Sequence, residues 1–162
     1  MKKETAPLEA LLFAAGEPLT KEKIAELMEI GIIDVSNLLR QLEKDLTDRG
    51  IVLREVAGGW QLSTRPEYFS LIERLAMTVN NKLSTSMLET LAIITYMQPV
   101  TKIEIEEIRG IKVDRMIAKL IEFDFIEEVG RKEVLGRPIL YGTTKNFLHT
   151  FGLKSLKDLP AI

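Results

Sequence analysis

Apolar side chains recur at helical spacing between residues 8 and 46. Residues 8–15, about 20–28 and 35–46 place them three and four positions apart, which predicts three helices that each bury one face. The expected buried residues are Leu8, Leu11, Leu12, Ala15, Ile24, Leu27, Met28, Val35, Leu38, Leu39, Leu42 and Leu46. Asp34 is the expected N-cap of the third helix because its side chain can accept a backbone N–H.

Two extended runs follow the third predicted helix. Residues 51–56 and 60–62 flank the pair Gly58-Gly59. Because both glycines tolerate positive φ, the pattern predicts a β-hairpin. Pro66 then suits the first position of a further helix that reaches about residue 79, before the polar break at residues 80–82. The residues expected to be buried in that helix are Tyr68, Leu71, Ile72, Leu75 and Val79.

The same order of elements recurs 81 residues later. Pro18-Leu19-Thr20-Lys21 recurs as Pro99-Val100-Thr101-Lys102, which indicates a divergent duplication. Helices are expected from Ser86, from Thr101 and over about 113–120, and Ser86/Glu89 and Thr101/Glu104 have capping-box spacing. Residues 126–129 and 139–143 are the expected hairpin strands, with a longer loop between them. The expected buried residues are Leu88, Leu91, Ala92, Ile94, Ile105, Ile108, Val113, Met116, Ile117 and Leu120.

Three helices followed by a hairpin is the order of a winged helix, in which the second and third helices form a helix-turn-helix and the hairpin is the wing. The predicted fold class is therefore mainly α with small β-hairpins (α+β), built as two tandem winged-helix domains. We place the N-terminal domain at residues 1–80. The C-terminal domain is placed at residues 81–162 and includes a short helix near residues 145–151 and a tail.

Composition excludes several kinds of site. The chain has 162 residues, no cysteine and one histidine, so disulfides and thiolate metal sites are impossible, and a zinc site would need His149 with carboxylates because there is no second histidine. We find no Gly-rich phosphate loop and no nucleophile with a base beside it, so we expect neither a cofactor nor catalysis. No apolar run approaches the roughly 20 residues of a membrane span, and the absence of cysteine is compatible with the cytosol.

A DNA-binding transcriptional regulator is one open alternative, because winged helices often read DNA with the third helix and the wing. Residues 1–80 hold ten basic and thirteen acidic side chains, which offers phosphates no cationic stripe. Residues 81–162 hold twelve basic and eleven acidic side chains. The candidate nucleic-acid contacts there are Arg115, Lys119, Arg131 and Lys132.

Protein recognition is the other interpretation. The first predicted helix is apolar on more than one side, because Leu12 can face the core while Phe13 points elsewhere. Leu8, Leu11 and Phe13 are therefore the candidate dimer interface, although core packing alone would also explain apolar residues there. A generic homodimeric adaptor with this interface stays open beside the other hypotheses.

Several ordered blocks carry a resemblance to a known family. They are Leu8–Leu19, Glu55–Leu62, Leu83–Ile94, Gln98–Gly110, Glu127–Lys132, Gly136–Thr144 and Phe151–Pro160. With these blocks the chain resembles the bacterial segregation and condensation protein B family over nearly its whole length.

The resemblance implies a non-catalytic accessory subunit of a cytoplasmic, nucleoid-associated complex. It implies a homodimer formed mainly by the first domain, and a kleisin partner, segregation and condensation protein A, bound principally by the second. An SMC ATPase and DNA would be contacted indirectly through that complex, which condenses and segregates the chromosome during cell division. Within the second domain we expect the kleisin to contact Gly136, Arg137, Pro138 and Tyr141, although these residues could equally shape the wing.

Overall fold

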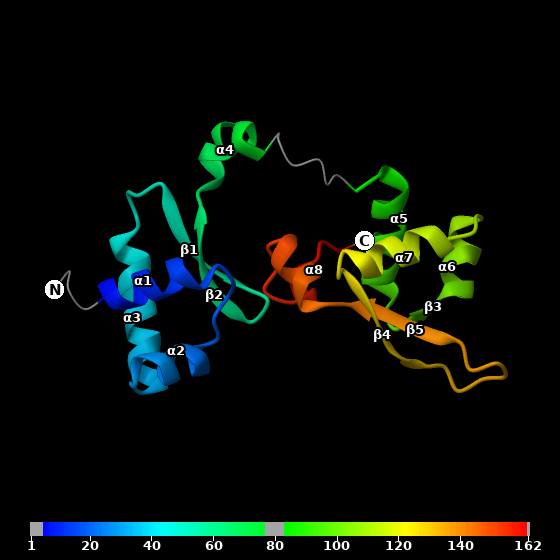
Figure 1. Ribbon diagram of the computed structural model, residues 1–162, viewed down its shortest axis with the longest axis horizontal. Coiled ribbons are helices and arrows are strands. Elements are labelled where there is room, and N and C mark those ends of the chain that lie inside the picture. The colour runs from blue at the N-terminus through cyan, green and yellow to red at the C-terminus, as the bar shows by residue number, and fades with distance from the viewer. Residues whose placement is uncertain (1–4, 77–82, 162) are drawn as a thin grey trace. The chain divides into compact units, whose positions relative to one another are not determined.

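The computed structural model describes residues 5–76 and 83–161, which form two compact units (Figure 1). The N-terminal unit comprises residues 1–80 together with 152–162, and the C-terminal unit comprises residues 81–151. The tail after residue 151, which the sequence-based division assigns to the second domain, thus packs with the N-terminal unit. The polar break expected at residues 80–82 and the predicted burial of Val79 lie outside the described residues.

The N-terminal unit is a winged helix with one extra helix. Its elements are α1 (Ala6–Ala15), α2 (Lys21–Met28), α3 (Ile32–Asp45), β1 (Ile51–Val56), β2 (Gly59–Thr64), the 3-10 turn η1 (Pro66–Tyr68), α4 (Phe69–Ala76) and, in the tail, the 3-10 turn η2 (Leu156–Asp158). The strands β1 and β2 pair antiparallel, with Ile51 opposite Thr64 and Val56 opposite Gly59. One apolar cluster joins α1, α2, α3 and β1, and its buried members are Leu8, Leu12, Ile24, Val35, Leu39, Leu42, Leu46 and Leu53.

The hairpin turn of this unit differs from the prediction by one residue. Positive φ occurs at Ala57 and Gly58, with values of 51° and 77°, so these two residues form the turn. Gly59 lies in β2 instead, where a Cβ would come within 2.9 Å of the Pro18 carbonyl carbon. Gly59 is therefore needed because, without a Cβ, it lets the backbone of Pro18 approach closely. The positive φ of the turn belongs to Ala57 and Gly58.

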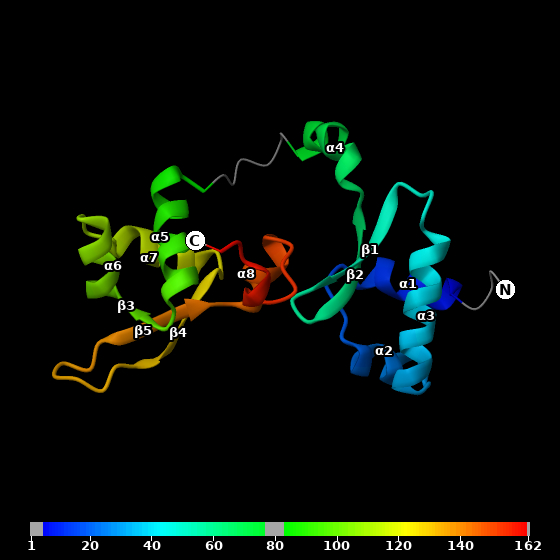
Figure 2. The same ribbon diagram turned by 180° about the vertical axis from the view of Figure 1, so that it is seen from behind.

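The C-terminal unit repeats the winged-helix order. Its elements are α5 (Thr85–Met97), β3 (Val100–Thr101), α6 (Lys102–Arg109), α7 (Asp114–Glu122), β4 (Ile126–Arg131), β5 (Ile139–Thr143) and α8 (Lys145–Thr150). The strands form one antiparallel sheet in the order β3-β5-β4, with a bulge in β4 between Glu128 and Gly130. The loop between β4 and β5 is the wing, and it extends beyond the helices of its own unit in both views (Figures 1 and 2).

A pair of strand contacts confirms the duplication at the level of backbone hydrogen bonds. Leu19 and Trp60 form an isolated antiparallel bridge, in which the Leu19 N–H donates to the Trp60 carbonyl at 2.9 Å and the Trp60 N–H donates back at 2.7 Å. Val100 pairs with Tyr141 in the same way in the other unit. Both residues of the second pair lie 81 positions after those of the first, which is the offset of the sequence repeat.

The predicted helix caps are partly wrong. The N-cap of α3 is Gly31, and Asp34 lies inside the first turn. The N-cap of α5 is Ser84, whose hydroxyl accepts the Met87 N–H at 3.3 Å, so the predicted pair of Ser86 and Glu89 does not form a capping box. The box of Thr101 and Glu104 on α6 is confirmed, because each side chain accepts a backbone N–H of the other.

Several residues predicted to be buried are exposed. They are Leu27, Tyr68, Leu71, Leu88, Ala92 and Ile108. The short helices carry apolar residues on more than the one side that packs against the core, so periodicity alone overestimates burial. The side chains of residues 75 and 76 lie outside the described part of the structure.

The tail contacts the hairpin of the N-terminal unit. The Ala57 N–H donates to the Leu153 carbonyl at 2.9 Å, and Lys154 forms an ion pair with Glu55 at 3.2 Å. Ser155 and Asp158 cap η2 reciprocally. The Ala57 N–H at the hairpin turn therefore has a hydrogen-bond acceptor, which a backbone N–H needs when another segment shields it from water.

Candidate functional site

The three residues predicted for a dimer interface lie at very different depths. Leu8 is 0% exposed and belongs to the core cluster, Leu11 is half-buried, and Phe13 is 82% exposed on α1. Leu8 therefore stabilises the fold and offers no side-chain surface to a second chain. Phe13 is the residue of the three that could be covered by a partner, because an exposed phenyl ring gains most from leaving water.

Other exposed apolar residues of this unit escaped the sequence analysis. Ile33 in the first turn of α3 and Phe69 at the start of α4 are both mostly exposed. Leu71 on α4, predicted to be buried, is exposed as well. Each of these side chains leaves apolar surface that would gain free energy if a partner covered it.

The wing residues predicted to bind the kleisin divide into exposed and buried ones. Gly136 and Arg137 have positive φ, 85° and 38°, and both are exposed, whereas Pro138 is half-buried. Tyr141 is 8% exposed and lies in β5, where burial raises the pKa of its phenol. Leu135, which the sequence analysis did not single out, is fully exposed in the wing loop.

Most of the predicted nucleic-acid contacts are occupied within the unit. Lys119 pairs with Glu122 at 2.8 Å and Lys132 pairs with Glu104 at 2.5 Å. Arg131 donates from Nη1 to the carbonyl of residue 137 at 3.1 Å. Arg115 is exposed and has no ion pair within the residues that the structure describes.

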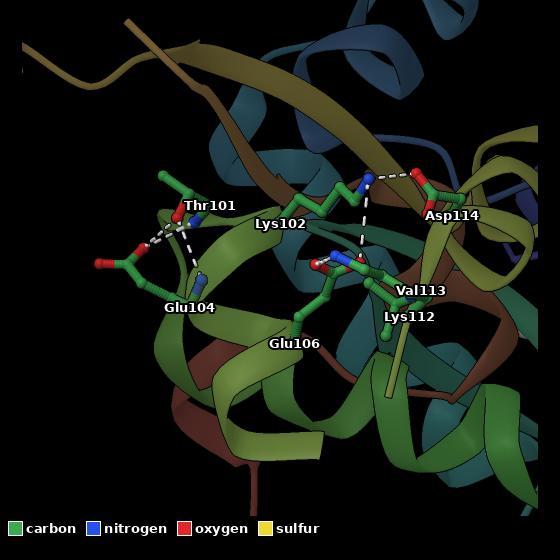
Figure 3. A network of polar contacts seen from close by, with 7 residues as sticks. All are labelled: Thr101, Lys102, Glu104, Glu106, Lys112, Val113 and Asp114. Atoms are coloured by element: carbon green, nitrogen blue, oxygen red, sulfur yellow. Dashed lines mark hydrogen bonds and ion pairs between the residues drawn. The ribbon is translucent and has the colours of Figure 1, made fainter. Parts of the chain in front are cut away.

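A polar network joins the two helices of the helix-turn-helix (Figure 3). Glu106 of α6 accepts from Lys112 at 2.9 Å and from the backbone N–H of Val113 at 3.2 Å. Lys102 lies 3.8 Å from Glu106 and forms a short hydrogen bond and ion pair with Asp114 at the start of α7. Lys112 lowers the pKa of Glu106 and Lys102 lowers that of Asp114, so both carboxylates stay ionised and neutralise the lysines.

Glu104 connects the start of α6 to the wing. Its Oε1 accepts from Lys132, and its Oε2 accepts the Thr101 N–H at 2.8 Å and the Thr101 hydroxyl at 2.7 Å. Lys132, followed by the Thr101 donors, lowers the pKa of Glu104 to about 2. The wing lysine is therefore paired with a carboxylate that stays ionised at neutral pH.

Arg109 also has an intramolecular role. Its side chain is 10% exposed and donates to the Ser86 carbonyl at 2.6 Å, the Thr90 hydroxyl at 2.7 Å and the Ser86 hydroxyl at 3.1 Å. An ion pair to Glu89 at 3.0 Å completes its contacts. Arg109 thus fixes the end of α6 to the start of α5, and both of its terminal nitrogens are engaged within the unit.

The described residues offer little for small-molecule chemistry. An apolar cavity of about 610 Å³ in the C-terminal unit is lined by Leu83, Leu88, Phe123, Phe125, Asn146, Thr150 and Phe151. This lining carries no acid, base or nucleophile pair. Within the described residues, 5–76 and 83–161, no three His, Asp or Glu side chains form a cluster that could hold a metal ion. Each helix in these ranges is too short or too polar to span a bilayer.

Comparisons with known proteins place the chain in a family. The profile of the family described as Segregation and condensation complex subunit ScpB matches residues 6–162. The chain belongs to this family. Segregation and condensation protein B of Symbiobacterium thermophilum is 52% identical to it over 96% of this chain and 72% of its own length. The protein of the same name from Desulforamulus reducens is 50% identical over 96% of this chain and 87% of its own length.

Membership of the ScpB family confirms the resemblance found in the sequence and associates the chain with chromosome segregation and condensation. A solved structure, the dimer of an ScpB N-terminal domain complexed with a ScpA peptide, is 34% identical and matches with a TM-score of 0.43 over 46% of this chain and 95% of its own.

Proposed function

We propose that the protein is a non-catalytic accessory subunit of an SMC–kleisin complex, a homodimer that binds the kleisin subunit segregation and condensation protein A. Membership of the ScpB family carries this proposal, and the exposed apolar residues of both units support it. In this proposal the SMC ATPase and DNA are reached through the kleisin, and the complex works in the cytoplasm at the nucleoid.

The proposed dimer contact is the exposed part of α1. Phe13 is mostly exposed, and its burial against a second copy would remove a whole phenyl ring from water. We expect Phe13→Asp to weaken self-association at least about tenfold, as replacement of a central aromatic contact usually does. Ile121→Asp on α7, which also replaces an exposed apolar residue, is the matched control and should leave the mass of the particle unchanged.

The proposed kleisin contact on the C-terminal unit is the wing, through Gly136, Arg137 and Pro138. Tyr141 lies in β5 and is too deeply buried to be a main contact. Leu135, fully exposed beside these residues, extends the contact with an aliphatic side chain. A kleisin segment that orders on this surface would gain apolar contacts against the cost of its own conformational entropy.

The transcriptional regulator is the weaker alternative. It needs free cations on α7 and the wing, yet Lys119 and Lys132 are paired with carboxylates. A duplex bound mainly by its phosphates would require those pairs to break, which removes part of the gain from counterion release.

The deciding experiment is co-purification with the kleisin encoded in the same genome, with the mass of the complex measured by light scattering. We expect a complex that contains two copies of this chain and that survives charge reversal at Arg115 and Lys119. Failure of the wild-type chain to bind the kleisin, or turnover of a small molecule by the purified chain, would contradict the proposal. Binding of free duplex DNA that falls steeply with salt would favour the regulator.

A further inference from the structure

The outer side of α6 combines aliphatic side chains with carboxylates. Ile103 and Ile111 are 59% and 46% exposed and line a shallow groove of about 450 Å³. The residues of this groove, which we call the α6 groove, are Ile103, Glu106, Glu107, Gly110, Ile111 and Lys112. Only Ile105 of α6 is fully buried, so this helix directs most of its aliphatic surface outward. Aliphatic surface of this kind gains free energy when a partner covers it.

The charges around the α6 groove disfavour nucleic acid. Glu106 engages Lys112 and the Val113 N–H, and Asp114 engages Lys102, so the cations and the N-terminus of α7 are neutralised from within (Figure 3). A helix N-terminus and two lysines would otherwise be suited to a phosphate. Glu107 is exposed and has no ion pair within the described residues, so it adds one uncompensated negative charge.

We propose that the α6 groove is a docking site for a polypeptide segment that carries an aliphatic side chain next to a lysine or arginine, and that the segment belongs to the kleisin. This inference rests on the proposed function. The aliphatic side chain would pack against Ile103 and Ile111, and the basic one would pair with Glu107, which is the charge complementarity that selects partners and register.

An ion pair also links α6 to the base of the wing. Glu104 follows Ile103 on α6 and is paired with Lys132 at the start of the wing loop. The α6 groove and the proposed wing contact are thus carried by elements that are held together within one unit.

The test measures affinity of the full-length chain for the purified kleisin by isothermal titration calorimetry. We expect Ile103→Ser to weaken binding at least about tenfold and Ile121→Ser, an exposed isoleucine of α7 outside the groove, to change it by less than about twofold. Glu107→Lys should also weaken binding about tenfold, whereas Glu127→Lys on β4, with the same change in charge, should not. Circular dichroism establishes that each variant is folded.

The possible outcomes separate the inference from the proposed function. If the wild-type chain does not bind the kleisin, the proposed function and this inference both fail. If the wild-type chain binds but Ile103→Ser and Glu107→Lys bind equally well, the inference fails and the proposed function stands. A loss of self-association in Ile103→Ser would assign the groove to a second copy of the chain, and a loss of duplex DNA binding would assign it to nucleic acid. Either result overturns the inference.

Discussion

Arg109 provides the sharpest test of how the C-terminal unit uses its cations. On sequence it belongs with the basic residues near the helix-turn-helix, but the structure directs its guanidinium inward to Ser86 and Thr90 of α5. Arg109→Ala removes three hydrogen bonds made by a charged donor from a side chain that is 10% exposed. The ion pair to Glu89 adds little, because that carboxylate is mostly in water.

The magnitude follows from these bonds. Hydrogen bonds to charged groups contribute about 1.5–3 kcal/mol each and do not add fully when they share one side chain, so we expect a loss of about 3 kcal/mol in the unfolding free energy of the C-terminal unit. A unit of this size has a urea m-value of roughly 1.5 kcal/mol/M, so the midpoint should fall by about 2 M. Arg109→Lys should lie between the wild type and Arg109→Ala, because a lysine cannot reproduce the planar set of donors.

The chain allows the two units to be observed separately. Trp60 is the one tryptophan of the sequence and lies in the N-terminal unit, so its fluorescence reports that unit, whereas far-UV circular dichroism reports both. We expect Arg109→Ala to shift the dichroism transition and leave the Trp60 transition in place. Arg115→Ala, on the exposed surface, should change neither by more than about 0.5 kcal/mol. If Arg109→Ala and Arg115→Ala behaved alike, Arg109 would not have the structural role assigned to it.

Three further predictions concern single side chains. Gly59→Ala should cost about 2 kcal/mol in urea titrations followed by Trp60, because the new Cβ would meet backbone at 2.9 Å, whereas Gly50→Ala, with its nearest contact at 3.8 Å, should cost less than about 0.5 kcal/mol. Arg65→Ala should cost about 2 kcal/mol in the same assay, because its guanidinium donates to three carbonyls just after α3. The pKa of Glu104 is lowered from 4.5 to about 2, so its stabilisation is present above pH 4.5 and lost as the pH falls towards 2. Because its side chain is 35% exposed, we expect only about 1 kcal/mol, and Glu104→Gln should remove that pH dependence from thermal unfolding measured between pH 2 and 5. Equal stability of the two glycine variants, an unchanged Arg65→Ala midpoint or an unchanged acid limb in Glu104→Gln would contradict the respective prediction.

The order of the elements could be predicted because it depends on local pattern. Helical periodicity, the turn glycines and the stretch that reads Pro-Leu-Thr-Lys in one copy and Pro-Val-Thr-Lys in the other each predict an element from neighbouring residues, and the structure contains all of them. The structure adds that equivalent residues of the repeat pair alike, as the bridges of Leu19 with Trp60 and of Val100 with Tyr141 show. The cap of α3 was missed because Gly31 caps with backbone geometry alone, without the side chain that identifies most caps.

Burial could not be predicted as well, for a physical reason. A helical pattern identifies which side of a helix is apolar, but it cannot show how much of that side a neighbouring element covers. Leu27 and Ile108 are equivalent positions of the two copies, and both were predicted to be buried, yet both are about half exposed. The position of Arg109 against α5 likewise depends on tertiary contacts that no spacing along the chain contains.

Comparison of the two copies indicates that the polar network serves the surface of the second unit and not the winged-helix fold as such. The positions equivalent to Glu104 and Glu106 in the N-terminal unit are Lys23 and Ala25, 81 residues earlier. That unit forms the same helices and hairpin without either carboxylate, so neither is needed to build the fold. Glu104 and Glu106 of the second copy pair instead with Lys132, Lys102 and Lys112. In the docking that we propose at the α6 groove, this pairing disfavours phosphate-rich partners while the isoleucines remain available for apolar contacts, which is the combination of repulsion and attraction that specific recognition uses.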